Sequence, residues 1–120
     1  MKILWISRHS MTEQQTAALK QLYGKFNIIT ADKTFSDASE IIAFEQDVDV
    51  YAAVLPTEIL ISLFKALPSD KELIIPSSKR LPTGNKVFNP ATNQYEQEYM
   101  FVHGGWKKLI CAEFETIDLI

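Results

Sequence analysis

The chain contains few residues of several types, and each shortage excludes a class of protein. It has a single cysteine, Cys111, among 120 residues, which excludes an internal disulfide and a zinc site built from cysteines. Chains without disulfides are typical of the reducing cytoplasm, where we expect this protein. No apolar stretch reaches the roughly 18 residues that a transmembrane helix needs, so we expect no membrane partner.

Cationic residues are also scarce. Twelve Lys and Arg stand against fifteen Asp and Glu, which gives a formal net charge of −3, and only two of the cations are arginines, Arg8 and Arg80. Binding of bulk nucleic acid without regard to sequence needs a strongly basic surface, so we expect no such partner. The hydrophobic fraction is 47%, and at this length it predicts one globular domain with a real core.

Short apolar runs alternate with helical patterns over residues 1–80. Thr12 and Gln15 form a capping-box pattern at the start of one helix, Gly24 is placed to end it, and Pro68 stops the third helix. This alternation predicts an α/β fold with a Rossmann-like, mostly parallel four-stranded sheet flanked by helices. The expected strands are 3–6, 26–30, 48–55 and 73–75, the last ended by Pro76, and the expected helices are 12–23, one that begins at Ser36 or Asp37, and 57–67.

Residues 81–120 predict a loop followed by a C-terminal antiparallel β-hairpin in the same domain. We expect its strands at 95–103 and 106–117, around a turn at Gly104 and Gly105. The hairpin is expected to extend the sheet or to make the contact of a homodimer. Its more apolar face would contain Tyr95, Tyr99, Phe101, Trp106, Ile110, Ala112 and Phe114.

Polar and cationic residues follow the predicted strands, where parallel sheets bind ligands. Arginine forks and helix N-termini there are receptors for anions, so we predict a pocket for a small anionic ligand, such as a nucleotide or a short oligonucleotide. The alternative is that charges collect at strand ends because these ends meet water. The prediction requires strands that end at residues 6 and 75. The candidate residues are Ser7, Arg8, His9, Ser10, Lys33, Thr57, Ser77, Ser78, Lys79 and Arg80.

His9 and Arg8 are the candidate catalytic pair. A histidine beside an arginine can act as a general acid or base, or as a nucleophile toward a phosphate that the arginine holds; the alternative is a polar turn. No glycine-rich loop follows the first strand, and the two histidines lack the spacing of metal ligands. The sequence therefore predicts no metal and no other cofactor.

The segment from Ile3 to Thr12, with Arg8, His9 and Ser10 at its centre, resembles the opening of the histidine phosphatase superfamily. His103-Gly104-Gly105 resembles the second histidine motif of that family. This resemblance implies a phosphoryl transfer in which His9 is the phosphorylated nucleophile, Arg8 binds phosphate and His103 is the partner of His9.

A second resemblance covers residues 1–80. The strand that leads into Ser7-Arg8-His9, together with Val54-Leu55-Pro56 and Leu60, is similar to small CRISPR-associated Rossmann-like proteins. These are related to domains that sense cyclic oligoadenylates, and several are candidate ring nucleases; similar proteins occur on mobile elements. The resemblance implies a dimer that holds a cyclic oligonucleotide at the strand ends, and cleavage there would need no metal. In that reaction a ribose 2′-hydroxyl attacks its own phosphate.

Three hypotheses therefore stand. The leading one is binding of an anionic nucleotide-type ligand at the strand ends, with or without metal-independent cleavage of a phosphodiester. The second is phosphoryl transfer through His9. The third is a non-catalytic interaction module of a phage or plasmid, which binds another protein through its hairpin.

Overall fold

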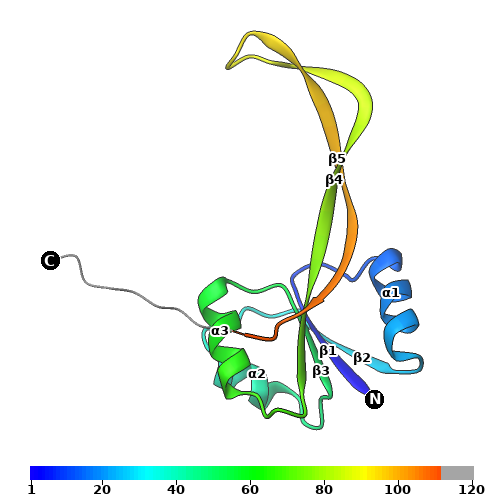
Figure 1. Ribbon diagram of the computed structural model, residues 1–120. Coiled ribbons are helices and arrows are strands. Elements are labelled where there is room, and N and C mark those ends of the chain that lie inside the picture. Colours follow the sequence, from blue (N-terminus) through cyan, green and yellow to red (C-terminus); the bar gives the residue numbers. More distant parts are fainter. Residues whose placement is uncertain (112–120) are drawn as a thin grey trace, which may run out of the picture.

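The computed structural model describes residues 1–111 and shows a mixed α/β fold (Figure 1). Its sheet has five strands in the order β2-β1-β3-β4-β5, rather than the four predicted. Pairing is parallel between β1 and β2, β1 and β3, and β3 and β4, and antiparallel between β4 and β5. The elements are β1 (Lys2–Ile6), α1 (Glu13–Tyr23), β2 (Asn27–Ala31), α2 (Ala38–Phe44), β3 (Val50–Ala53), α3 (Thr57–Ala66), β4 (Glu72–Asn89) and β5 (Gln94–Lys108).

Helices cover both faces of the parallel part of the sheet (Figure 1). On one face Leu19 of α1 packs with Trp5 and Ile74. On the other face Ile41 of α2 and Leu63 of α3 pack in a second cluster. The four residues of β3 are all buried, as in a strand covered on both sides, but β3 ends at Ala53, two residues before the end of the predicted strand.

The helix boundaries follow from local capping. The predicted capping box of α1 is present, since the Gln15 amide donates to the Thr12 hydroxyl at 3.1 Å and the Thr12 amide donates to the Gln15 side chain at 2.9 Å. Asp37 caps α2 by accepting from the Glu40 amide at 3.0 Å. Hydrogen bonds from the Ser39 hydroxyl and the Glu40 amide lower the pKa of Asp37 below its usual value. Local sequence therefore fixes where these two helices begin.

The prediction that Pro76 ends the fourth strand is wrong. β4 continues through Pro76 to Asn89. It pairs with β3 only from Glu72 to Ile74, so at Pro76 the side toward β3 is an edge that needs no N–H donor, and proline is tolerated there. Pro82 lies at the irregularity between Pro82 and Lys86, where the ladder is already interrupted.

The hairpin exists, but it is built from β4 and β5. The expected turn at Gly104 and Gly105 is wrong: both glycines lie inside β5, beside a register shift between Ser77 and Ser78. A Cβ on Gly104 would lie 3.1 Å from the Ser77 Oγ, and Gly105 has φ +107°, so this β-bulge requires glycine. The chain reverses instead between Asn89 and Gln94. Residues 112–117 of the expected last strand, with Ala112 and Phe114, lie outside the described residues.

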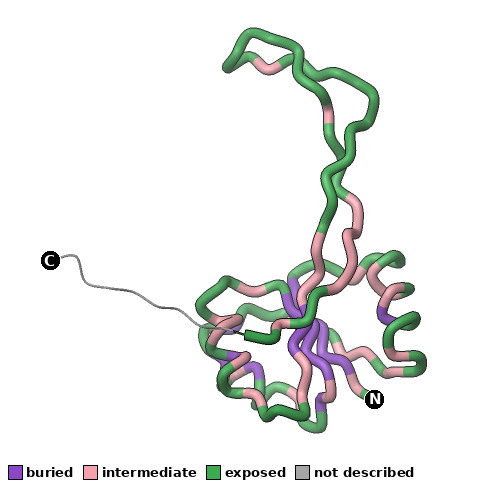
Figure 2. Tube along the Cα trace, viewed as in Figure 1, coloured by how far each residue is buried: buried purple, intermediate pink, exposed green. Residues whose placement is uncertain are grey.

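Most of this hairpin extends away from the rest of the molecule (Figures 1 and 2). We call residues 78–103 the arm, and residues 1–77 and 104–111 the body. The radius of gyration is 18.0 Å, against about 14 Å for a compact chain of this length. Figure 2 shows the arm almost entirely exposed, whereas the buried residues lie in the body. Among residues 1–111, no helix has the length and apolar character needed to cross a membrane.

Candidate functional site

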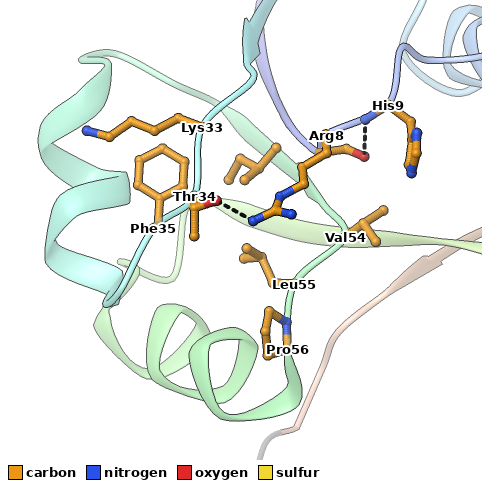
Figure 3. Close-up of a pocket in the computed structure, with 10 residues that line it drawn as sticks. Arg8, His9, Lys33, Thr34, Phe35, Val54, Leu55 and Pro56 are labelled. Carbon is orange, nitrogen blue, oxygen red and sulfur yellow. Dashed lines mark hydrogen bonds between the residues drawn. The ribbon is translucent and has the colours of Figure 1, made fainter.

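The main candidate site is a pocket of about 300 Å³ at the carboxyl ends of β1, β2 and β3 (Figure 3). The chain passes from β1 to β2 on one side and later places β3 on the other side of β1. Parallel sheets bind ligands at such a reversal of strand order. Its lining comes from the segments that follow the three strands: Ile6, Ser7, Arg8, His9, Lys33, Thr34, Phe35, Val54, Leu55 and Pro56.

Arg8 reaches across the middle of this pocket. Its Nη2 donates to the Thr34 Oγ1 at 2.7 Å, and Leu55 and Pro56 lie on the other side of the guanidinium (Figure 3). The ion pairs within residues 1–111 are Lys2–Glu45 and Lys108–Glu72, so no carboxylate of the described chain neutralises Arg8. The guanidinium is thus held in place by a neutral partner and retains donors for an anion.

Two hydrogen bonds hold the backbone of the loop that carries Arg8. The Trp5 indole Nε1 donates to the His9 carbonyl at 2.9 Å, and the His9 amide donates to the Ser7 Oγ at 3.1 Å. Ser7 is only 8% exposed, so its hydroxyl is used to shape the backbone. We conclude that Ser7 positions the loop, while Arg8 is the residue that faces the pocket.

The other predicted residues of this pocket lie at its margins. Lys33 is exposed, and its Nζ lies 5.4 Å from the centre of the Phe35 ring. In Figure 3 the Lys33 amine and the His9 imidazole are directed toward opposite ends, away from the Arg8 guanidinium. Lys33 therefore adds positive charge to the rim, and His9 does not share the centre with Arg8.

Helix α3 begins beside the same pocket. Its N-cap residue is Pro56 and no side chain caps it, whereas α1 and α2 are capped by Thr12 and Asp37. The first amides of a helix lack intrahelical acceptors and carry partial positive charge. Thr57, a predicted ligand residue, is the first residue of α3 and is exposed. The free amides of α3 thus add to the positive field that Arg8 creates.

Ser77 and Ser78 lie at a different place, in a second pocket of about 480 Å³ at the base of the arm. Thr12, Gln15 and His103 also line it. Neither imidazole nitrogen of His103 has a hydrogen-bond partner in the described structure. The two histidines thus line separate pockets, His9 the first and His103 the second.

Lys79 and Arg80 line neither of these two pockets. They were expected just past a strand that ends at residue 75, but β4 continues and carries them into the arm. There the Arg80 guanidinium lies 4.0 Å from the centre of the Tyr99 ring. Ser10 is exposed between β1 and α1 and also lines neither of the two pockets. The structure thus brings Ser7, Arg8, His9 and Lys33 together and separates them from the serines and cations of β4.

Sequence reasoning did not select Thr34, Val54 and Leu55 as site residues. Thr34 lies three residues after the end of β2, so its place in the segment after a strand was the available signal for it. Val54 and Leu55 read as part of a buried strand, but β3 ends at Ala53 and Val54 is exposed. No pattern in the sequence distinguishes these last two residues from the core.

No family model matches the chain, and neither a curated protein nor a solved structure matches it.

Proposed function

We propose that this protein binds a small phosphate-bearing ligand, of the nucleotide class, in the pocket at the carboxyl ends of β1, β2 and β3. The observation that carries the proposal is the Arg8 guanidinium, held by Thr34 across the centre of the pocket with no carboxylate of the described chain against it. An arginine fork suits a phosphate better than a point charge does. The uncapped start of α3 supplies further donors.

The rest of the lining favours a nucleotide over inorganic phosphate. Val54, Leu55 and Pro56 form an apolar side of the pocket opposite Thr34. A volume of about 300 Å³ is at the low end for small-molecule sites, which span roughly 300–1,000 Å³. A cyclic oligonucleotide, as the CRISPR-associated resemblance implies, would need the pockets of two copies, each holding part of the ring.

The test is binding of AMP, ATP and cyclic tetra-adenylate, measured by calorimetry, followed by mass analysis of the nucleotide. We expect Arg8→Ala to weaken binding about tenfold to a hundredfold, because a hydrogen bond to a charged group contributes about 1.5–3 kcal/mol. Thr34→Val keeps the shape of Thr34 but removes its bond to Arg8, and we expect a smaller loss. Lys20→Ala, an exposed cation on α1, is the matched control.

Arg80→Ala tests whether Arg80 shares a site with Arg8, as the sequence predicts, or lies apart from it in β4, as in the structure. If the pocket at the carboxyl ends of β1, β2 and β3 is the site, removal of Arg80 leaves the affinity for AMP and ATP unchanged; equal losses for Arg8→Ala and Arg80→Ala with these two nucleotides would contradict the proposal. Failure of all three nucleotides to bind at millimolar concentration would also contradict it. Mass analysis shows whether a bound nucleotide is cleaved, and covalent phosphate trapped on His9 would instead indicate phosphoryl transfer.

A further inference from the structure

We propose that the arm is the contact surface of a homodimer, in which the aromatic face of each arm packs on the body of the other copy. This inference concerns a different part of the molecule from the ligand pocket and does not depend on the proposed function. It follows from the apolar surface of the arm, from the distribution of charge on its two faces and from its length.

The arm exposes a large apolar surface. Seven of its large hydrophobic residues are between 39% and 72% exposed, which amounts to roughly 700 Å² at about 200 Å² per large side chain. These residues lie on both faces of the ribbon. The four aromatic rings share one face and expose roughly 460 Å² there, which is comparable to the about 300–600 Å² of the largest apolar patch on a typical monomer, a patch that is often functional. The seven residues are Leu81, Val87, Phe88, Tyr95, Tyr99, Met100 and Phe101.

The arm also lacks a core of its own. Its described pairing is a two-stranded ribbon with both outer edges free, and an isolated two-stranded ribbon is at best marginally stable in water. Phe88 and Tyr95 contact each other near the tip at 5.4 Å between ring centres, yet Tyr95 is still 71% exposed. A partner that covers these rings would stabilise a ribbon that the body alone does not support.

The strand register divides the arm into two faces of different charge. Cross-strand partners share a face, so the pairs Phe88↔Tyr95, Pro82↔Tyr99 and Arg80↔Phe101 define one face, and Lys86↔Gln97 lies on it as well. We call this the aromatic face. It carries two cations, Arg80 and Lys86, and no carboxylate, because Glu96 and Glu98 alternate onto the opposite face.

This charge pattern favours the body of a second copy as the partner. Two aromatic faces packed on each other would bring four cations together. The arm has three Lys or Arg and two Glu, whereas the body has nine Lys or Arg and ten Asp or Glu. The cationic aromatic face therefore meets less repulsion on the nearly neutral body of a second copy than on a second aromatic face.

The length of the arm and the area of its aromatic face are also compatible with packing on the body of a second copy. The β4 half of the arm, from Ser78 to Asn89, is about 40 Å long at 3.3 Å per residue, which exceeds the roughly 30 Å diameter of a body of this size. The aromatic face offers roughly 500 Å² at about 200 Å² per ring. Reciprocal exchange of arms covers that face and a similar area of the body on each chain, more than the about 800 Å² per partner of a standard interface.

The test is the mass of the full chain in solution, measured by light scattering during gel filtration over a range of concentrations. We expect the wild type at twice the chain mass of 13.7 kDa. The double variant Tyr95→Ser with Phe101→Ser should fall to the mass of one chain. Leu22→Ser is the matched control, because Leu22 is 62% exposed but lies on α1, and it should remain dimeric.

Arg80→Glu combined with Lys86→Glu should weaken the dimer at least tenfold at low salt, and circular dichroism should show that all variants retain secondary structure. A monomeric wild type, or a dimer that the arm variants leave intact, would overturn the proposal. A monomer that binds a 20-nucleotide oligo(dT) in a way that needs Tyr95 and Phe101 would overturn it too, and would assign the aromatic face to nucleic acid.

Discussion

Trp106 joins the arm to the body, and its replacement gives the sharpest test of the structure. The ring lies edge-on to Trp5, with 5.9 Å between ring centres and an interplanar angle of 83°. Its Nε1 donates to the Gln15 carbonyl of α1 at 3.1 Å. We consider two changes: Trp106→Phe, which keeps a ring but removes the donor, and Trp106→Ala, which removes both.

The two variants should lose different amounts of stability, because only Trp106→Ala removes the ring contact with Trp5. Trp106→Phe loses one hydrogen bond, worth about 1 kcal/mol, and the Gln15 carbonyl stays satisfied within its helix. Trp106→Ala also loses the aromatic pair, worth about 0.5–1.5 kcal/mol, and the burial of the ring. Because Trp106 is only partly buried, we take the lower end for a Trp→Ala change, about 3 kcal/mol. These losses correspond to falls in Tm of roughly 4 °C and 12 °C.

Urea and thermal unfolding at one fixed protein concentration, followed by circular dichroism, measure both losses; the concentration is fixed because association shifts apparent stability. Leu22→Ala, on the exposed side of α1, is the control and should change the free energy of unfolding by no more than about 0.5 kcal/mol. The reasoning would be refuted if Trp106→Ala cost less than about 1 kcal/mol, or no more than Trp106→Phe.

Three further predictions concern the body. Thr12→Ala removes the capping box of α1 and should cost about 1 kcal/mol in urea unfolding; no loss would show that the cap is not needed. Leu63→Ala removes a fully buried side chain of α3 and should cost about 2–5 kcal/mol, whereas a cost near that of Leu22→Ala would contradict its place in the core. Asp37 has a lowered pKa in the folded state, chiefly because of the Ser39 hydroxyl. The stability that the ionised Asp37 adds to the folded state is therefore fully present above the pKa of Asp in the unfolded chain, about 3.9. It is lost as the pH falls through the folded pKa. Asp37→Asn should lose less stability than the wild type on acidification, and parallel pH profiles would contradict this.

The sequence predicts the body well because its signals are local. Thr12 and Gln15 can satisfy each other's backbone donors whatever the rest of the chain does, and Asp37 caps α2 in the same way. The unbroken apolar run at β3 needs cover on two faces, which a central strand between helices supplies.

The arm was not predictable by the same reasoning. Pro76 reads as the end of a strand unless one knows that β4 has lost its neighbour β3 at that point. Gly104 and Gly105 read as a turn unless the bulge opposite Ser77 is known. Both errors depend on partners that are distant in the sequence, and the error at Pro76 also placed Lys79 and Arg80 wrongly beside Arg8.

The position of the hairpin turn has a consequence for how the chain folds. Only residues 90–93 separate the two long strands β4 and β5, so the entropy lost on closing that loop is small, and hairpins form within about 1–10 μs. The pairing of β1 with β3 joins residues 47 positions apart and is slower to form. The ribbon can therefore form transiently while the parallel sheet is still open, with its free edges and aromatic rings in solvent. At high protein concentration this order of events favours exchange of ribbons between chains during refolding.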